Sequence, residues 1–250
     1  MSEKQPWQDD GSRAGKDRKN TIGIVGEIAA PVELIVNASD WKRKVYETKL
    51  TRERPSGKED IYILQFDGYA AGSEETVHKI KEGAKVIVGG EIRTENVRDP
   101  QPEENSVKVF IYAEVIAIND PPAKEQNGVR ICGKICKPPR FRSTSRRTEN
   151  GKKIPVASIT VAVNTPNSTS YIPCVCYGWN ALRANLLKVG DYVEIYGHFR
   201  SRDYRKRIEG QELPYIRTTH EVSIAKLKTD REKKETSRKR KENRVNEDTE

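Results

Sequence analysis

The sequence predicts an all-β protein made of two copies of one small barrel, with charged and disordered ends. Three observations support this fold class: an internal repeat, strand-like alternation of apolar residues, and one short helical segment in each copy. The chain of 250 residues has room for two domains of roughly 100 residues each. We expect an N-terminal arm over 1–19, barrels over 20–121 and 122–225, and a charged tail over 226–250.

The repeat has one offset of 107 residues. Residues 20–31 match residues 127–138 with glycine, proline and apolar positions in register. Chance similarity between two β-rich stretches does not explain an offset that persists along both copies, so we infer a duplicated domain. The same offset pairs Gly83 with Gly190, Val86 with Val193, Gly90 with Gly197, and Arg93 with Arg200.

Strands dominate each copy. In the second copy we expect strands over 129–136, 154–163 and 171–177, where apolar residues recur with period two. In the last of these, Tyr171 and Tyr177 fall on one face, because residues an even number apart point to the same side of a strand. Two more strands close each copy.

One short helix is expected between the third and fourth strands of each copy. In the second copy Leu182, Leu186 and Val189 are spaced i, i+4, i+7 and form its apolar stripe. In the first copy Val77 and Ile80 form the stripe. Five strands with a helix in this place is the order of an OB barrel. The expected helix ends are Ser73 and Gly83 in the first copy and Gly190 in the second.

Composition argues against a membrane or secreted protein. Apolar residues make up 34% and charged residues 33%, and no stretch approaches the roughly 18 consecutive apolar residues of a membrane span. The first twenty residues contain no apolar core of a signal peptide. We therefore expect a cytoplasmic protein.

Positive charge is concentrated in the second copy. Residues 20–121 contain 13 basic and 18 acidic residues, a net charge of −5, whereas residues 122–225 contain 18 and 8, a net charge of +10. A concentrated positive charge favours a polyanionic partner. We expect that partner to bind the second copy.

The second copy resembles the bacterial single-stranded DNA-binding proteins along nearly its whole length. The similar segments are 156–163, 171–178, 188–204 and 221–224. The first copy is similar only through the repeat. Family members with two barrels in one chain are known, and this chain resembles them. The most specific positions are Gly190, Asp191, Gly197, Arg200, Arg202 and Tyr204.

The resemblance implies a function and a set of partners. It implies a non-enzymatic, cofactor-free cover for single-stranded DNA in replication, recombination or repair, in the bacterial cytoplasm with the nucleoid. It also implies a homodimer that gathers four barrels. The chain ends Arg244 to Glu250 without the acidic-hydrophobic tip by which family members recruit replication proteins, so recruitment by that route is doubtful.

A protein that holds a single strand without reading its sequence needs cations for phosphates and rings on which bases stack. The first loop of the second copy supplies both, and its Asn150-Gly151 pair predicts a hairpin turn that makes this loop a basic finger. A solvated basic loop is the alternative. The candidate contacts in this loop are Arg140, Phe141, Arg142, Arg146, Arg147, Lys152 and Lys153.

Three further rings are candidates. Tyr171 and Tyr177 occupy positions where the family places stacking aromatics, although half-buried tyrosines on a sheet are the alternative. Trp179 follows Gly178 at the start of the helix, and a packing role for it is equally open.

The fourth strand of the second copy ends in alternating cations and a ring. A period of two places these side chains along one strand face, as tracking of a phosphodiester backbone requires. The family has a ring at the Tyr204 position. The candidates on this strand are Arg200, Arg202, Tyr204 and Lys206, with Arg205 and Arg207 beside them.

The first copy lacks most of these groups. At the equivalent positions Tyr204 becomes Val97, Arg202 becomes Glu95, and Tyr177 becomes Asp67. Carboxylates repel phosphates, so we expect the first barrel to be a structural or pairing partner. A minor contribution from Tyr62, Trp41 and the basic residues at 42–44 stays open.

No metal or catalytic site is expected. Cys132 and Cys136 are four residues apart on a strand, roughly 13 Å, which is too far for one zinc ion. With Cys174 and Cys176 they are expected to be buried and reduced. Two other hypotheses stay open, an RNA-binding OB protein and a scaffold that binds only proteins.

Overall fold

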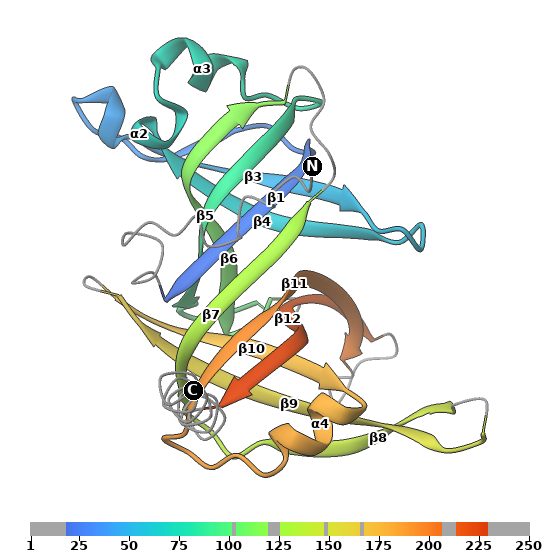
Figure 1. Ribbon diagram of the computed structural model, residues 1–250. Coiled ribbons are helices and arrows are strands. Elements are labelled where there is room, and N and C mark those ends of the chain that lie inside the picture. Colours follow the sequence, from blue (N-terminus) through green and yellow to red (C-terminus); the bar gives the residue numbers. More distant parts are fainter. Residues whose placement is uncertain are drawn as a thin grey trace, which may run out of the picture.

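The computed structural model describes residues 19–101, 104–119, 126–147, 150–165, 168–206 and 214–229. Twelve strands form one continuous sheet that closes into two barrels, one above the other in Figure 1. The predicted all-β class with tandem OB barrels is confirmed. None of the helices within these ranges is long and apolar enough to cross a membrane.

Barrel 1 is built from the first half of the chain. It closes where β1 pairs with β3 in addition to β5, and its strand β4 runs parallel to β6. Its elements are β1 (Asn20–Ile28), β2 (Glu33–Val36), η1 (Trp41–Arg43), β3 (Val45–Glu53), β4 (Glu59–Asp67), α2 (Gly68–Ala71), α3 (Glu74–Lys79), β5 (Lys85–Asn96) and β6 (Val107–Ile118).

Barrel 2 repeats this arrangement. It closes through β7 and β9, with β10 parallel to β12. Its last strand continues four residues past the expected boundary at 225. Its elements are β7 (Asn127–Ile135), β8 (Arg140–Arg147), β9 (Lys153–Asn164), β10 (Thr169–Tyr177), α4 (Trp179–Ala184), β11 (Tyr192–Lys206) and β12 (Tyr215–Thr229).

Each barrel has one strand more than the five expected. The segment after the first strand was expected to be a loop, but it pairs with the following hairpin, as β2 with β3 and β8 with β9. These pairings satisfy backbone groups that a loop would leave to water. β2 and β8 are therefore the two ends of the twelve-stranded sheet.

In barrel 1 the predicted stripe and N-cap are right, although two short helices, α2 and α3, stand where one was expected. The side chains of Val77 and Ile80 are buried, and the Ser73 hydroxyl accepts a hydrogen bond from the Thr76 amide at 3.1 Å as an N-cap. Helix α3 ends at Lys79 with Ile80 as its C-cap, so Gly83, which has a positive φ of 83°, lies beyond the end of the helix.

In barrel 2 a short helix lies where it was expected, between β10 and β11, but its predicted apolar stripe and its predicted end at Gly190 are wrong. Helix α4 ends at Ala184, so the expected stripe does not lie on one continuous helix. Leu186 is 79% exposed, and Leu182 and Val189 are exposed as well. The short helix lies on the barrel through small residues that permit close approach, and Leu187 continues this buried side. The buried residues of α4 are Ala181 and Ala184.

The two barrels are joined through their first strands. β1 and β7 pair antiparallel with Gly23 opposite Gly128. Asn20 lies opposite Ile131 and Ile24 opposite Asn127, so the repeat positions exchange across a local two-fold axis. The sheet therefore continues from one barrel into the other, as Figure 1 shows for β1 and β7.

A buried asparagine fixes the same strand pairing in each barrel. The Asn20 side chain donates to the Ile92 carbonyl at 2.7 Å and accepts from its amide at 3.2 Å. Asn127 makes the equivalent pair of bonds with Phe199, at 2.7 and 2.9 Å. Since buried polar groups need partners, these bonds tie β1 to β5 in barrel 1 and β7 to β11 in barrel 2.

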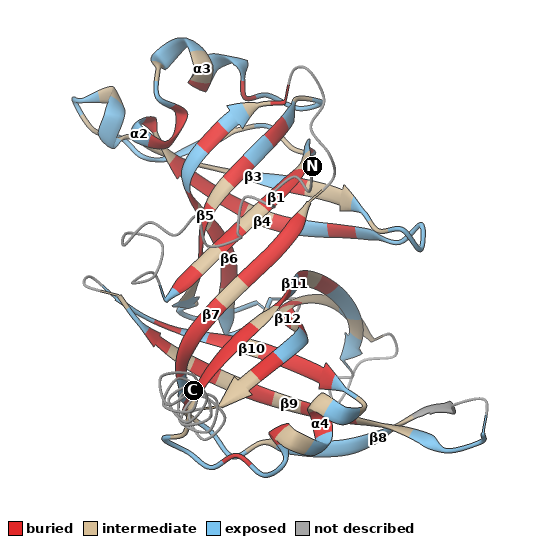
Figure 2. Cartoon of the chain, in the orientation of Figure 1, coloured by how far each residue is buried: buried red, intermediate tan, exposed pale blue. Residues whose placement is uncertain are grey.

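The apolar interior runs through both barrels, and Figure 2 shows buried residues along the central strands of each. At the junction the Tyr62 ring stacks on Phe199, with centroids 5.2 Å apart. The Tyr62 hydroxyl donates to the Phe199 carbonyl at 2.8 Å. Tyr62 is fully buried, so the option that it contributes a surface ring is excluded.

Candidate nucleic-acid interface

The outer side of β8, β9 and β10 brings several predicted contacts together. The register places Arg142 opposite Val156, and Val156 opposite Tyr177, so these three side chains share one row and one face. In parallel rows Arg140 lies opposite Ser158, and Tyr171 opposite Ala162. With neighbouring strands about 4.8 Å apart, Arg142 and Tyr177 lie about 10 Å apart across this three-strand face.

The two tyrosines of β10 are exposed while the residues between them seal the core. Tyr171 is 53% and Tyr177 48% exposed, whereas Ile172 and Cys176 are fully buried. The predicted parity of the strand is confirmed. Because the tyrosines are six residues apart, their Cα atoms are roughly 20 Å apart along the strand. Each ring therefore presents a separate platform to solvent.

The basic loop forms a hairpin of β8 and β9 that extends beyond the barrel (Figure 1). Gly151 turns with a φ of 70°, as the Asn-Gly signal predicts. Lys152 and Lys153 are exposed near this turn. The side chains of Arg146 and Arg147 lie outside the described residues.

Phe141 does not share a face with its basic neighbours. It pairs with Ala157, whose side chain lies in the core cluster, whereas Arg140 and Arg142 pair with outward residues. Phe141 is 42% exposed on that opposite side of the hairpin. The hairpin therefore has a cationic face and an aromatic face.

Trp179 is the most exposed of the predicted rings, at 73%. It follows Gly178, whose φ of 58° and ψ of −129° belong to a region that is essentially restricted to glycine. This turn ends β10 directly after Tyr177 and starts α4. The packing alternative for Trp179 receives no support from its exposure.

The candidates on the fourth strand of the five-stranded order lie on β11, and three of them have partners. The Arg200 guanidinium lies 3.1 Å from an Asp60 carboxylate oxygen of barrel 1. The Tyr204 hydroxyl donates to the Asn105 side chain, also in barrel 1, at 2.9 Å. Arg202 lies 3.5 Å from Glu221 and stays largely exposed. Arg205 and Lys206 are exposed, and Arg207 lies outside the described residues.

Asp60 was not predicted, and it organises the contact between the barrels. Its fully buried carboxylate accepts hydrogen bonds from Arg54, from Arg200 and from the Ser201 amide at 2.8 Å. Burial alone would raise the pKa of Asp60, but these donors outweigh it and lower the pKa. Arg200 is thus held at the barrel junction, and its predicted phosphate contact stays a prediction.

The side of barrel 1 that corresponds to the three-strand face carries an exposed cation, Lys49 opposite Ile63, but aliphatic and acidic residues stand in place of the two tyrosines. Anchored on the glycine before each helix, Tyr171 corresponds to Ile61 and Tyr177 to Asp67. Asp67 caps α2 by accepting from the Ala70 amide at 2.9 Å, and it accepts from the Tyr112 hydroxyl at 3.0 Å. These carboxylate bonds stabilise barrel 1 rather than bind an anion.

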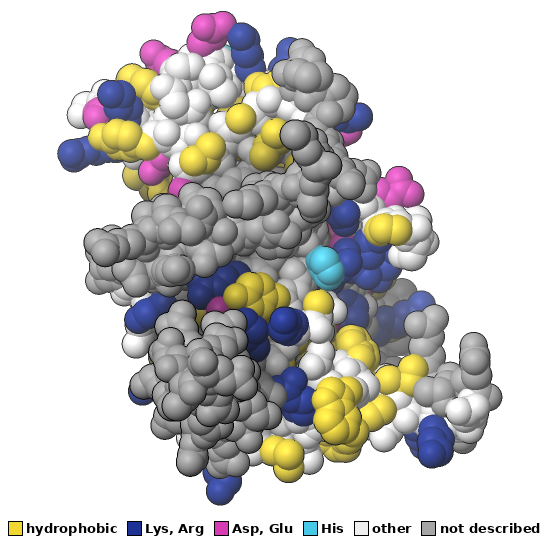
Figure 3. All heavy atoms as spheres, in the orientation of Figure 1, with side chains coloured by type: hydrophobic (Ala, Val, Ile, Leu, Met, Phe, Trp, Pro, Cys, Tyr) yellow, Lys and Arg dark blue, Asp and Glu magenta, His cyan; other side chains and the backbone are white. Residues whose placement is uncertain are grey.

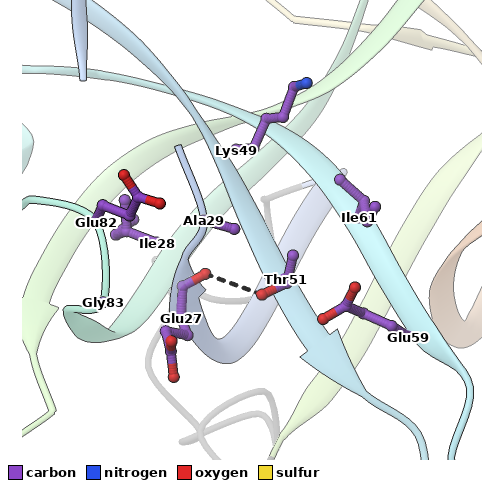
Figure 4. Close-up of a pocket in the computed structure, with 9 residues that line it drawn as sticks. All are labelled: Glu27, Ile28, Ala29, Lys49, Thr51, Glu59, Ile61, Glu82 and Gly83. Carbon is purple, nitrogen blue, oxygen red and sulfur yellow. Dashed lines mark hydrogen bonds between the residues drawn. The ribbon is translucent and has the colours of Figure 1, made fainter. Parts of the chain in front are cut away.

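A shallow pocket of barrel 1 is acidic as well. Glu27, Glu59 and Glu82 line it, with Lys49 as its one basic lining residue (Figure 4). In the view of Figure 3, most visible acidic side chains gather over barrel 1, whereas basic ones dominate barrel 2. The charge difference found in the sequence is therefore also a difference between two surfaces.

Sequence comparison missed one exposed ring in barrel 1. Tyr69 is 58% exposed, and the Lys42 ammonium lies 5.9 Å from its ring centroid. The alignment of Gly68 with Gly178, which makes Asp67 the counterpart of Tyr177, also makes Tyr69 the counterpart of Trp179, but Tyr69 was not singled out.

The four cysteines, all among the described residues, form no disulfide, and Cys132, Cys174 and Cys176 are buried as expected, whereas Cys136 is half-buried. Burial raises the pKa of the Cys176 thiol to about 11. Among the residues that the structure describes, no three His, Cys, Asp or Glu side chains gather as a metal site.

Solved structures share this fold. The wild-type single-stranded DNA binding protein from Thermus aquaticus matches with a TM-score of 0.62 and 17% identity, over 84% of this chain and 92% of that chain. A deletion mutant of the same protein matches with a TM-score of 0.60 and 17% identity, over 84% of this chain and 93% of that chain. No protein-family model and no curated protein matches the chain. At this identity the likeness is one of fold.

Proposed function

We propose that this chain, which has the tandem-barrel fold of the Thermus aquaticus protein, binds and protects single-stranded DNA without sequence preference. Barrel 2 supplies the main contacts, and barrel 1 serves chiefly as a structural partner. The protein acts without catalysis or a cofactor in replication, recombination or repair, in the bacterial cytoplasm near the nucleoid.

The three-strand face is the observation that supports this proposal most strongly. It combines two exposed rings on β10 with two cations on β8, and the basic hairpin continues from it. Rings and cations in this combination fit a strand whose bases stack while its phosphates are neutralised. Stacking and phosphate contacts of this kind do not depend on the identity of the base, which favours tolerance of sequence.

A direct test is a titration of the full chain that follows tyrosine and tryptophan fluorescence. Oligo-dT should quench it, and an RNA of equal length should compete poorly. Equal competition by RNA would support the RNA-binding alternative, because stacking and phosphate contact do not distinguish the two sugars. Absence of binding to either strand would support the scaffold alternative.

Salt dependence tests the electrostatic part. Five or six cations on phosphates should give a slope of roughly −3.5 to −4 for log K against log salt, at about −0.7 per phosphate on single strands. We expect this slope for oligo-dT at several salt concentrations. A flat response would show that the +10 charge of residues 122–225 is not the binding footprint.

We further propose a homodimer with four barrels. The duplication motivates it, because two tandem chains supply as many barrels as four single-barrel chains. Light scattering at micromolar concentration should report twice the chain mass of 28.4 kDa. A monomer under these conditions would refute the dimer and leave the binding proposal standing.

A further inference from the structure

We propose that Tyr69 and Lys42 form a second contact for single-stranded DNA, at the far end of barrel 1, which only a long strand reaches. This inference rests on the proposed function and extends it to a site in the barrel that has lost the other contacts. The ligand is one unstacked base with its neighbouring phosphate.

The repeat places Tyr69 and Trp179 at the same point of the two barrels. Tyr69 follows Gly68 after β4, and Trp179 follows Gly178 after β10. Each ring lies in the first turn of the next helix, α2 or α4. Both rings face solvent, at 58% and 73% exposure. Within the described residues, Tyr69 stacks on no other ring. No other described ring therefore occupies a face of Tyr69, and a base can stack on it.

A cation is held beside this ring by the backbone. Gly68 packs so closely on η1 that an added Cβ would come within 2.5 Å of the Trp41 carbonyl oxygen and 2.7 Å of the Lys42 Cα. This close approach places the Lys42 ammonium 5.9 Å from the centroids of both the Trp41 and Tyr69 rings. Gly178 of barrel 2 meets nothing within 4 Å, so this packing is specific to barrel 1.

Of the carboxylates nearest to this site in sequence, Asp40, Asp67 and Glu75 are engaged, whereas Glu74 is exposed at the start of α3. Asp40 accepts from the Lys42 amide at 3.1 Å, and Asp67 accepts from Ala70 and Tyr112. Glu75 on α3 is paired with Lys79 at 2.8 Å. The 3-10 helix η1 and its C-cap residue add three consecutive basic residues at 42–44. The balance at this end of barrel 1 therefore permits a phosphate, unlike the acidic pocket of Figure 4.

Position decides which strands use the site. In Figure 1, α2 and α4 lie at opposite ends of the molecule. One OB fold covers roughly 4–16 nucleotides, so a strand of roughly 8 nucleotides occupies barrel 2 alone. A strand of roughly 40 nucleotides extends from the three-strand face across to Tyr69.

The test compares Tyr69→Ala with wild type on oligo-dT of these two lengths. Base stacking is worth about 1–3 kcal/mol, so affinity for the long strand should fall roughly 5- to 140-fold while affinity for the short strand is unchanged. Tyr69→Phe should restore long-strand affinity because it keeps the ring. Lys42→Gln should weaken long-strand binding and lower its salt slope by about 0.7.

Val115→Ala is the matched control, since Val115 is 60% exposed on β6 and takes no part in either site. Unchanged long-strand affinity in Tyr69→Ala would overturn the inference. If Tyr177→Ala weakens binding at both lengths in that case, the proposed function survives alone. If wild type binds neither strand, both fail.

Discussion

Barrel 1 and barrel 2 place different side chains at equivalent points of one fold. Asn20 and Asn127 make the same buried bonds, and Gly90 and Gly197 lie at the same bulge, where a Cβ would collide with a carbonyl of the neighbouring strand. The exposed residues differ much more. Ile61 stands where barrel 2 has Tyr171. The duplicated positions thus secure the fold, and the surface is free to diverge in charge and ring content.

The two sides of the barrel junction differ in the same way. On one side the Ile61 amide donates to Ser201 at 2.9 Å, and on the other the Tyr171 amide donates to Thr94 at 2.8 Å. Ser201 and Thr94 are repeat equivalents. Only the first side has the buried carboxylate of Asp60, because Ser170 occupies the equivalent place on the other. The junction is therefore two-fold in hydrogen bonding but not in charge.

The largest effect should come from breaking this charged side. Asp60→Ala leaves Arg54 and Arg200 without their common carboxylate and should lower the free energy of unfolding by about 3–5 kcal/mol. Urea unfolding followed by circular dichroism measures it. The comparison is Ser170→Ala, which should cost about 1 kcal/mol. Equal losses would mean that the junction is symmetric in energy as well.

The next effect concerns DNA affinity at the end of β11. Tyr204→Ala should weaken binding of single-stranded DNA by about 1–3 kcal/mol, because a stacking platform is lost. Its repeat counterpart Val97→Ala should leave affinity nearly unchanged, although lost packing can lower stability. Fluorescence titration with oligo-dT tests both. If Tyr204→Ala binds like wild type, the ring serves only the contact with Asn105.

A smaller effect concerns the stability of the junction against pH. His220 packs on Tyr62 and Phe199 and its Nε2 lies 2.8 Å from the Ile61 carbonyl. Burial lowers the pKa of His220 below its usual 6.5, so folding favours the neutral ring. The contribution of neutral His220 to the free energy of unfolding is complete above pH about 6.5, and it is lost as pH falls toward the lowered pKa.

The free energy of unfolding should therefore fall between pH 7.5 and 5.5, and His220→Gln should flatten that fall. Urea unfolding at both pH values measures the slope. Asp60 contributes to the free energy of unfolding over a different pH range. Because its pKa is lowered, this contribution is lost only as pH falls below about 4. A slope that His220→Gln leaves intact would assign the pH response to other groups.

Local patterns in the sequence predicted the fold and part of the site. Period two correctly placed Tyr171 and Tyr177 outward on β10, because side chains of a strand alternate strictly. The predicted apolar stripe of Leu182, Leu186 and Val189 was wrong, because the helix ends at Ala184 and the later two residues do not lie on it.

Contacts between the two copies could not be predicted from such local patterns. Asp60 and Arg200 are 140 residues apart, and the fold brings them together only after both barrels close and pair. Tyr62 likewise looked like a surface ring on a strand, and its burial depends on Phe199 of the other barrel. The shared sheet also means that separated barrels would expose β1 and β7, so the roles of the barrels are best compared within the intact chain.

One measurement tests the central claim, that barrel 2 is the main binding barrel, most directly. Tyr171 and Ile61 are repeat equivalents with similar exposure, 53% and 42%, and similar backbone bonds to the opposite barrel. Tyr171→Ala and Ile61→Ala in the full chain should be titrated with a short oligo-dT at one salt concentration. We predict a loss of about 1–3 kcal/mol for Tyr171→Ala and nearly none for Ile61→Ala. Equal losses in the two variants would contradict the division of function between the barrels.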